Sequence, residues 1–345
     1  MRIAVTGASG GIGTHVLRHL TADPAVEGVV ALSRAVPAGP LPRGVSWHRV
    51  DLADPACMPA LVTAFRGCDT VVHLAWAWQP SHDGDLLRAT NVDGTWRVLH
   101  ALRRAGVPGF VHASSAGVYS PGPKDRRVDE TWPAGGVRAS SYSAQKLEAE
   151  RLVDTFERLE PRVRVARLRP AVVVGGATDQ TRYVLGPFLP RGFDPRRLPV
   201  VPALADLVVQ LVHADDAGRA FALAATTDVR GSFNVAGEPA VNAHLIAEAL
   251  GVRAVRVPTW LARSLVDVTW RLRVQPVDRG WLEMALAVPL LDTGRARADL
   301  AWTPVHDARS ALVEALGTGP LTLPRPVAAR TGQEREGRVP RRHAA

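Results

Sequence analysis

Short apolar runs alternate with longer stretches of helical periodicity along the first half of the chain. The apolar runs lie at 3–6, 29–32, 45–50, 70–74, 110–114 and 163–168. Helical patterns follow the first run through residue 20 and then occupy 55–65, 85–104 and 141–158. Strands that are buried on both faces and alternate with helices form parallel sheets covered on both sides. The pattern therefore predicts βαβ units and a parallel central sheet.

The regular alternation of apolar runs and helical stretches ends after Pro170. Residues 175–202 are rich in glycine, proline and arginine, which predicts loops around a pocket. Two further apolar runs, 208–212 and 232–235, are expected to be strands that return to the sheet. A helix over 215–226 is expected between them.

The remainder of the chain is mainly helical over 242–316 and predicts a smaller lobe that closes over the sheet. Its tryptophans, Trp260, Trp270 and Trp281, are interpreted as core residues rather than as the lining of a substrate site. From about residue 320 the composition loses all periodicity. We therefore expect 318–345 to be a disordered basic tail.

Composition places the chain among soluble globular proteins. It has 345 residues, 46% of them hydrophobic and 22% charged, which suits one large domain or two closely joined ones. The two cysteines, Cys57 and Cys68, are too few for a disulfide framework. The N-terminal apolar run is too short for a signal peptide, and no run of about 18 apolar residues predicts a membrane span. The prediction is a cytoplasmic protein.

The net charge of +9 comes almost entirely from arginine, since Lys124 and Lys146 are the only lysines. Residues 325–345 hold six arginines and two glutamates, so this segment carries +4 and the body +5. The body charge is scattered and is not interleaved with aromatic residues that would stack on bases, so specific nucleic-acid binding is not predicted. A polyanion or membrane-surface contact through the basic tail stays open as an addition.

A glycine turn stands between the first strand and the first helix. Its members are Gly7, Ser9, Gly10, Gly11, Ile12 and Gly13. Glycine at 7 permits the tight turn, glycine at 10 lets the backbone approach a pyrophosphate, and glycine at 13 lets helix and strand pack closely. The helix N-terminus offers unpaired N–H groups and the positive end of its dipole to an anion. The turn therefore predicts a dinucleotide site.

The end of the second strand bears on which dinucleotide binds. A carboxylate there would accept hydrogen bonds from the adenosine ribose of NAD and repel the extra phosphate of NADP. This chain has Arg34 instead, which can pair with a 2′-phosphate. The alternative is a solvent-exposed arginine in an arginine-rich chain. We expect NAD(P) as the cofactor, with NADP favoured over NAD.

Tyr142 and Lys146 lie four residues apart near the start of a predicted helix, so the phenol and the ammonium share one face. A phenol with the ordinary pKa of about 10 is a poor base at neutral pH, and a neighbouring cation lowers that pKa. A proton shuttle to a carbinol or carbonyl oxygen needs this change. The preceding strand ends in Ser114 and Ser115, and a hydroxyl there can hydrogen-bond the reacting oxygen. A plain surface Tyr–Lys pair is the alternative.

These features resemble the short-chain dehydrogenase/reductase superfamily and, within it, its extended branch, the NAD-dependent epimerase/dehydratase family. The spacing Thr-Gly-x-x-Gly-x-x-Gly is the first match, and Ser115, Tyr142 and Lys146 are the next. Further matches follow in family order at 72–75, 91–95, 114–119, 168–170, 212–217 and 233–237. The resemblance spans residues 3 to about 237.

The resemblance implies an α/β fold, namely a Rossmann-type doubly wound parallel sheet with a smaller, mainly helical C-terminal substrate lobe. The NAD(P)-binding domain would comprise 1–169 with returning segments at about 205–236. The substrate lobe would comprise 170–204 and 237–317. Helices 85–104 and 141–158 would pair in a homodimer.

The resemblance also implies residue roles. Tyr142 would be the general acid/base, Lys146 would hold the nicotinamide ribose and tune Tyr142, and Ser115 would orient the substrate oxygen. The implied cofactor-binding residues are Gly7, Ser9, Gly10, Gly11, Ile12, Gly13, Arg34, Asp51, Leu52, Ala75, Asn91 and Lys146. His73, at the end of the fourth strand, is interpreted as structural.

Two departures from the family pattern narrow the reaction. The 4,6-dehydratases place Asp-Glu directly after the catalytic hydroxyl residue, where this chain has Ala116 and Gly117. The UDP-hexose 4-epimerases carry an asparagine shortly after the sixth-strand arginine, and residues 169–172 lack it. Elimination and a UDP-sugar substrate are therefore disfavoured, although other sugar nucleotides stay open.

His213, Asp215 and Asp216 superficially resemble metal ligands. They lie at a predicted strand-to-helix junction, where aspartate is a good N-cap, so no metal site is predicted. The sequence as a whole predicts an NAD(P)-dependent oxidoreductase acting on a small-molecule carbinol or carbonyl. The alternative is a dinucleotide-binding sensor or scaffold on the same fold. Because such proteins often lose the tyrosine or the lysine and this chain keeps both, the enzyme is favoured.

Overall fold

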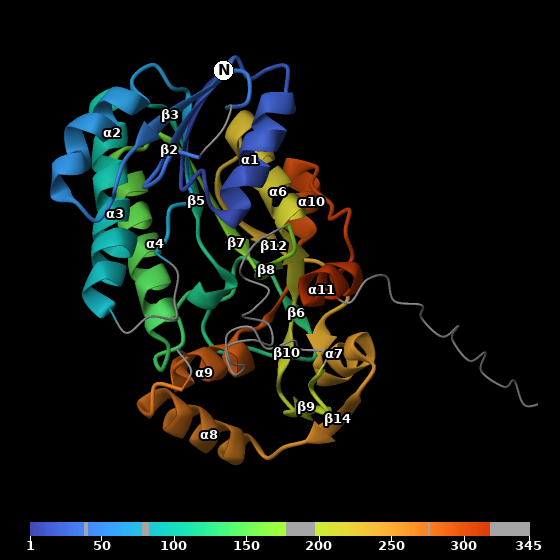
Figure 1. Cartoon of the computed structure of the whole chain (residues 1–345). Coiled ribbons are helices and arrows are strands. Elements are labelled where there is room, and N and C mark those ends of the chain that lie inside the picture. Colours follow the sequence, from blue (N-terminus) through green and yellow to red (C-terminus); the bar gives the residue numbers. More distant parts are fainter. Residues whose placement is uncertain (38–40, 78–82, 177–196, 275–276, 318–345) are drawn as a thin grey trace, which may run out of the picture.

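Seven parallel strands form the central sheet, in the spatial order β12-β7-β5-β4-β1-β2-β3 (Figure 1). The computed structural model describes residues 1–37, 41–77, 83–176, 197–274 and 277–317. The strands are β1 (Arg2–Thr6), β2 (Gly28–Ser33), β3 (Val45–Arg49), β4 (Thr70–His73), β5 (Gly109–Ala113), β7 (Arg164–Pro170) and β12 (Gly231–Val235). The order reverses between β1 and β4, and open α/β sheets bind ligands beyond the carboxyl ends of strands at such a switch point. The predicted Rossmann-type doubly wound sheet is confirmed.

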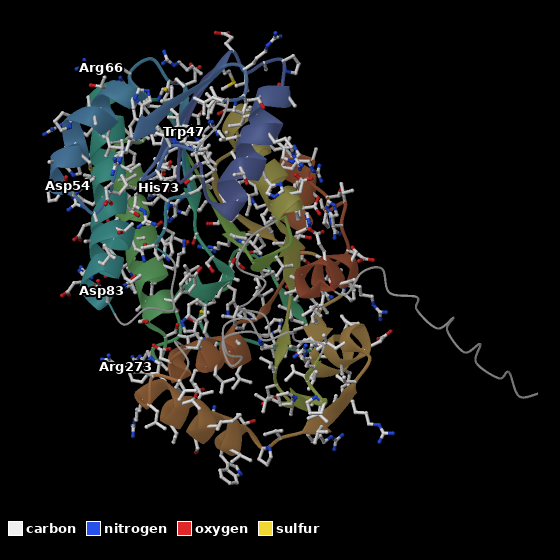
Figure 2. All side chains as sticks on the ribbon, viewed as in Figure 1. Trp47, Asp54, Arg66, His73, Asp83 and Arg273 are labelled. Atoms are coloured by element: carbon white, nitrogen blue, oxygen red, sulfur yellow. The ribbon has the colours of Figure 1, made fainter. Side chains whose placement is uncertain are left out.

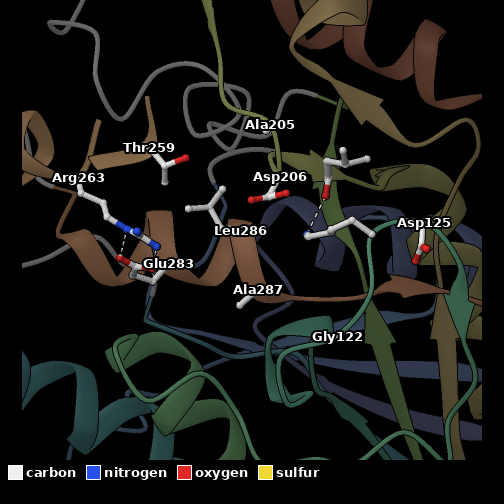
Figure 3. Close-up of a pocket in the computed structure, with 11 residues that line it drawn as sticks. Gly122, Asp125, Ala205, Asp206, Thr259, Arg263, Glu283, Leu286 and Ala287 are labelled. Carbon is white, nitrogen blue, oxygen red and sulfur yellow. Dashed lines mark hydrogen bonds and ion pairs between the residues drawn. The ribbon is translucent and has the colours of Figure 1, made fainter. Parts of the chain in front are cut away.

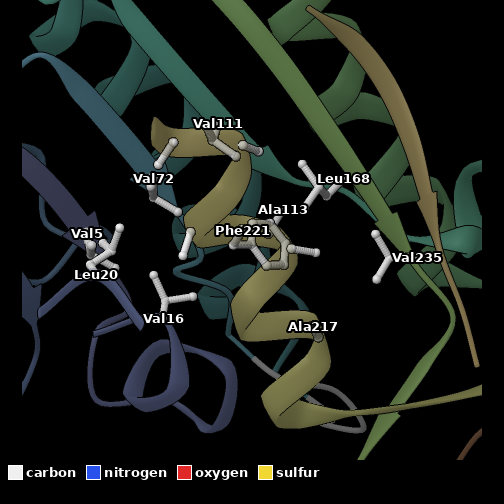
Figure 4. Close-up of a cluster of buried hydrophobic side chains, with 14 of the residues drawn as sticks. Val5, Val16, Leu20, Val72, Val111, Ala113, Leu168, Ala217, Phe221 and Val235 are labelled. Atoms are coloured by element: carbon white, nitrogen blue, oxygen red, sulfur yellow. The ribbon is translucent and has the colours of Figure 1, made fainter. Parts of the chain in front are cut away.

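Helices cover both faces of this sheet (Figure 1). One face carries α2 (Met58–Phe65), α3 (Gly84–Ala105) and α4 (Ser141–Leu159), and the other carries α1 (Gly11–Ala22), α6 (Ala214–Thr226) and α10 (Gly294–Leu300). Alternation along β1 explains the two layers, since Ile3 and Val5 pack toward α1 and α6 while Ala4 packs toward α2 and α3. Phe221 of α6 lies against the sheet at the centre of the first layer (Figure 4).

Short strands outside the central sheet correct one prediction. Of the two runs expected to return to the sheet, only β12 does so, and it pairs with β7. The other run forms β10 (Val208–Val209) and β11 (Leu211–His213), of which β11 pairs with β8 (Val172–Val174). The outer edge of β7 is already occupied by β12, so β11 pairs instead with the continuation of the chain beyond Pro170. The remaining pairs are β10 with β13 (Val241–Asn242), β9 (Val200–Ala203) with β14 (Arg253–Arg256), and β6 (Arg127–Val128) with β15 (Leu290–Leu291).

A smaller group of elements lies at the far end of the molecule from β3 (Figure 1). We call it the C-terminal lobe; it comprises β9, β10, β13 and β14 with α7 (Ala243–Leu250), α8 (Thr259–Arg271) and α9 (Arg279–Ala287). The last helix, α11 (Ala308–Leu316), packs beside α7. The predicted loops at 175–202 lie mostly outside the described residues, and the predicted tail at 318–345 lies wholly outside them.

Two further expectations about this half of the chain were wrong. Trp260 is 66% exposed and is no core residue, because only one face of α8 packs on the lobe. The N-cap of α6 is His213, whose side chain accepts a hydrogen bond from the Asp215 nitrogen, rather than an aspartate. Asp216 instead accepts hydrogen bonds from the backbone N–H groups of Val305 and His306. These bonds hold the segment before α11 against α6. Among the helices of the described ranges, none combines the length and the apolar character needed to cross a membrane.

Candidate functional site

The glycine turn follows β1, directly beside the switch point. Gly7 has a φ of +72°, and a Cβ there would lie 2.6 Å from the nitrogen of Ala75. A Cβ at Gly13 would lie 2.3 Å from the Gly7 oxygen. At Gly10 the nearest atom would be the same oxygen at 3.2 Å, so the fold itself comes close to tolerating a side chain there. Packing therefore requires glycine at positions 7 and 13. Gly10 is not required in this way, and without a side chain it leaves the N-terminus of α1 accessible.

The N-terminus of α1 has no side-chain cap. Gly10 is its N-cap, Gly11 and Ile12 begin the helix, and no acidic residue lies in its first turn. Side chains of aspartate, serine or asparagine cap other helices of the chain, among them α3, α4, α7 and α9. Ser9 and Gly10 are exposed. The unpaired N–H groups and the helix dipole thus suit a pyrophosphate, and the residues fit a dinucleotide.

The residues predicted to contact the adenosine follow β2 and β3. Arg34 is exposed just after β2. Asp51 is exposed after β3, and its carboxylate accepts the Ala53 N–H at 3.0 Å. Leu52 is buried, and its carbonyl accepts a hydrogen bond from Arg97 at 2.5 Å. The two charged side chains therefore stand at neighbouring strand ends, on the same edge of the sheet as the glycine turn.

Asn91 of α3 joins two parts of the site. Its Oδ1 accepts the Ala77 N–H at 2.6 Å, and its Nδ2 donates to the Ala77 oxygen at 3.1 Å and to Gln145 Oε1 at 2.9 Å. The amide thereby ties the segment after β4, which includes Ala75, to α4. The geometry gives Asn91 a positioning role, and the contact with the cofactor implied by the resemblance stays a prediction.

His73 at the end of β4 lies inside the sheet (Figure 2). Burial, together with the charge of Lys146, lowers its pKa to about 3, so the imidazole is neutral. The Thr95 hydroxyl donates to the Asn91 oxygen at 2.6 Å, so it accepts from His73 Nε2 at 3.0 Å. His73 Nδ1 then accepts from the Thr6 hydroxyl at 2.7 Å. Both ring nitrogens are satisfied within the fold, in keeping with a structural residue.

Tyr142 lies in the first turn of α4. Ser140 caps this helix through the Ser143 N–H, and the Ser143 hydroxyl donates to the Gly117 oxygen at 2.6 Å. The phenol is buried, and a hydrogen bond with Ser115 contributes to its environment. Burial raises the pKa of Tyr142 to about 12, and the Ser115 hydrogen bond lowers it only in part. Ser115 and Tyr142 are thus brought together although they lie far apart in sequence.

Lys146 is buried one turn further along α4. Its ammonium donates to the Ala113 oxygen at 2.9 Å and lies 3.6 Å from the centroid of the Trp76 ring and 6.0 Å from that of Tyr142. Burial lowers its pKa to about 7, against the opposing effect of Glu150. We expected this cation to lower the pKa of Tyr142. In this structure burial dominates that pKa instead, because the ammonium faces Trp76 and a carbonyl.

A buried polar network stands behind these residues. The Glu150 carboxylate accepts hydrogen bonds from the Ser114 hydroxyl and from the Arg169 guanidinium. Arg169 also donates to the Tyr119 hydroxyl at 3.0 Å, and that hydroxyl donates to Asn234 at 2.7 Å. The network occupies Ser114, which leaves Ser115 as the serine of this pair that meets the Tyr142 phenol.

Helix α9 of the C-terminal lobe closes over Tyr142. The rings of Trp281 and Tyr142 have centroids 4.9 Å apart. A Cβ at Gly117 would lie 3.1 Å from the Met284 sulfur and 3.3 Å from the Tyr142 ring, so this position has little room for a side chain. A Cβ at Gly280 would lie 2.2 Å from the Ala139 oxygen, which shows how closely α9 approaches the start of α4.

A cavity of about 720 Å³ lies beside α9, and Figure 3 shows the residues that line it. It is lined by Gly122, Lys124, Asp125, Ala205, Asp206, Val208, Thr259, Arg263, Glu283, Leu286 and Ala287. Lys124 is held at its rim by the carbonyls of Val208, Ala285 and Val288. The lining includes neither Tyr142 nor Lys146, so the cavity does not contain the candidate catalytic residues.

Sequence reasoning missed four residues of this site. Trp76 directly follows the matched segment 72–75, and Glu150 follows Lys146 by one helical turn, so spacing alone offered a signal for both. Trp281 was considered as the lining of a substrate site but interpreted as a core residue, and Met284 carried no signal, because both reach Tyr142 from a different lobe.

Comparison with known proteins identifies the family of the chain and relatives of its fold. The model of the NAD dependent epimerase/dehydratase family matches residues 3–236. The uncharacterized protein Rv0501 of Mycobacterium tuberculosis is 28% identical over 319 residues, covering 88% of this chain and 80% of that protein. The decarboxylating sterol-4-alpha-carboxylate 3-dehydrogenase of Saccharomyces cerevisiae is 31% identical over 138 residues, covering 39% of this chain and 38% of that enzyme. The solved structure of MoeE5 in complex with UDP-glucose and NAD has a TM-score of 0.67 and 25% identity, covering 92% of this chain and 98% of that one.

Proposed function

The chain belongs to the NAD dependent epimerase/dehydratase family, and we propose that it is an NAD(P)-dependent oxidoreductase acting on a carbinol or carbonyl carbon of a small molecule. One observation carries the proposal. The buried phenol of Tyr142 meets Ser115, with the Lys146 ammonium 6.0 Å from the centroid of the phenol ring, in a chain whose glycine turn leaves the N-terminus of α1 without a side-chain cap. A sensor would have no need for a buried tyrosine and lysine at the switch point of the sheet.

The residues of the chain position the substrate and move its proton. The nicotinamide supplies or accepts the hydride. With a pKa of about 12, Tyr142 holds its proton at neutral pH, which suits donation to the alkoxide that develops as a carbonyl is reduced. Ser115 hydrogen-bonds the reacting oxygen, and the Lys146 ammonium stabilises the phenolate left behind.

The surroundings of Tyr142 bear on the substrate. Trp76, Trp281 and Met284 make the cover of the site largely apolar, which favours a substrate with an apolar surface next to its carbinol carbon. A side chain at position 117 would crowd the Met284 sulfur, and this position lacks the acidic residue expected of a dehydratase. We propose oxidation or reduction, or epimerisation through transient oxidation, of a sugar nucleotide or another hydroxy or keto compound.

The proposal also includes a preference between NAD and NADP. MoeE5 was solved with NAD, whereas Arg34 of this chain is exposed at a position where it can reach a 2′-phosphate. We propose that Arg34 favours NADP. The variant Arg34→Asp should then shift the ratio of NADPH to NADH affinity toward NADH in calorimetry, and an unchanged ratio would refute the preference.

We also propose a homodimer through α3 and α4. These helices pack together, and Leu86 and Trp96 of α3 are 44% and 46% exposed. Sedimentation should show a dimer that Trp96→Glu dissociates. A wild-type monomer would exclude this arrangement.

The decisive experiment combines binding with turnover. NAD, NADH, NADP and NADPH are titrated by calorimetry, and a panel of hydroxysteroids and sugar nucleotides is then assayed with the dinucleotide that binds. Tyr142→Phe should keep dinucleotide affinity and lose about 10²–10⁴-fold in turnover. Tyr119→Phe removes the buried phenol hydroxyl of the network behind the site, which bonds Arg169 and Asn234 rather than Ser115, and should keep most of the turnover. Equal turnover by wild type and Tyr142→Phe would favour the sensor.

A further inference from the structure

The outer face of α8 is apolar and open to solvent. Its exposed large side chains are Trp260 (66%), Leu261 (46%), Leu265 (62%), Val268 (52%) and Leu272 (69%). The last four follow at intervals of four, three and four residues, which places them in one stripe along the helix. Val266, on the opposite side, is the one buried residue of α8. Soluble proteins rarely leave a contiguous patch of this kind without a partner.

Arginines flank the stripe at both ends. Arg253 and Arg256 lie on β14, just before α8, and Arg271 and Arg273 lie at its C-terminal end. Figure 2 labels Arg273. All four are exposed. Within the described part of the chain, none of them forms an ion pair.

The acidic groups nearby are already matched. Asp267 lies 3.4 Å from Arg279. Glu283 pairs with Arg263 at 2.8 Å and with Arg279 at 2.9 Å. Asp278 caps the N-terminus of α9. The four flanking arginines therefore give the apolar stripe a positive rim without compensating charge.

We propose that this face of α8 docks on the surface of an anionic lipid bilayer. A helix with tryptophan and leucine on one face and basic residues around it lies in the plane of the membrane interface. Its apolar stripe enters the boundary between headgroups and acyl chains, and the arginines contact anionic headgroups. Each arginine near such a surface adds about 1 kcal/mol, or roughly fivefold in affinity.

The positive charge around the stripe favours an anionic bilayer over two other partners. A second copy of the chain, joined through the same face, would bring the four arginines against four like charges. A nucleic acid would match the arginines but leave the stripe of leucines and valine in water. A bilayer with anionic lipid satisfies both features, and the proposal does not depend on the activity proposed above.

Vesicle binding of the full-length protein tests the proposal. Vesicles of phosphatidylcholine alone and of phosphatidylcholine with phosphatidylserine are sedimented with wild type at low and at physiological salt. Binding should require phosphatidylserine and weaken with salt. The pair Arg271→Gln and Arg273→Gln should lose about 25-fold in affinity. Replacing Leu261, Leu265, Val268 and Leu272 by glutamine should abolish binding, with folding checked by circular dichroism.

Matched controls separate the other sources of binding. Val36→Gln with Val305→Gln removes exposed apolar side chains elsewhere and should leave binding unchanged. A full-length variant with the six arginines of residues 325–345 changed to glutamine should still bind. Leu265→Cys carrying a polarity-sensitive dye should report an apolar environment only with anionic vesicles. Absence of binding, binding lost only in the tail variant, or a dimer dissociated by the α8 substitutions would each overturn the proposal.

Discussion

Two arginine–glutamate pairs show how differently the two halves of the molecule are built. Arg169 and Glu150, behind the candidate catalytic residues, have side chains that are 7% and 4% exposed, and they join a network of further buried groups. Arg263 and Glu283, between α8 and α9, are 37% and 18% exposed. Water screens the second pair and not the first. Loss of one partner should therefore cost more stability in the sheet half than in the C-terminal lobe.

The glycines of the turn after β1 also differ from one another, in how strictly the fold requires them. At Gly13 and Gly7 a Cβ would lie under 3 Å from backbone atoms, so the strand and helix leave no alternative there. Gly10 is limited by one contact at 3.2 Å. A position required by the fold can thus be distinguished from one whose small size serves a ligand.

Removing one charge from each ion pair should give the largest difference. Glu150→Gln leaves the Arg169 charge buried without its partner and should cost about 3–5 kcal/mol of unfolding free energy. Glu283→Gln should cost about 1 kcal/mol or less, because its arginines reach water. Urea denaturation of both variants measures this. Similar losses would mean that burial does not distinguish the two ion pairs.

Substitution of the glycines should sharpen the second contrast. Gly13→Ala forces a methyl group against backbone and should cost about 1–3 kcal/mol of unfolding free energy. Gly10→Ala should change stability by no more than about 0.5 kcal/mol yet weaken dinucleotide binding. Denaturation and calorimetry together test this pair. Strong destabilisation by Gly10→Ala would remove the argument for a ligand at that position.

The two lysines should respond differently to pH. The buried Lys146 has a pKa of about 7, below its value in the unfolded chain, so folding releases a proton between that pH and about 10.5. Its contribution to stability therefore rises with pH across this window, by at most about 1.4 kcal/mol per pH unit. Lys146→Met should lose this rise. Lys124→Met, the matched control, should lose a rise that begins near its own pKa of about 8. Parallel pH profiles for wild type and Lys146→Met would contradict the prediction.

Truncating the tryptophan that closes the site should have the smallest effect. Aromatic pairs such as Trp281 and Tyr142 contribute about 0.5–1.5 kcal/mol, so Trp281→Ala should lower kcat/KM about 2- to 12-fold. Dinucleotide affinity should not change, because α9 belongs to the C-terminal lobe. Trp260→Ala, at an exposed position of the same lobe, is the control and should keep kcat/KM in lipid-free assays.

Local features of the sequence predicted the sheet half. Apolar runs predicted the strands, and helical periodicity predicted the helices. Both patterns arise from burial and can be recognised in residues that are close together in the sequence. The glycine turn and the spacing of Tyr142 and Lys146 were readable for the same reason, since a turn and one helical face are set by residues a few positions apart. The family resemblance that rested on these motifs is confirmed across residues 3–236.

Tertiary structure alone decided what surrounds those motifs. It brought Trp281 and Met284 onto Tyr142 and paired β11 with β8 instead of the central sheet. It also set the pKa of Tyr142, which depends on burial by residues far along the chain. Each of these depends on contacts between distant segments, and no local pattern records which apolar side chains such a contact will bring together.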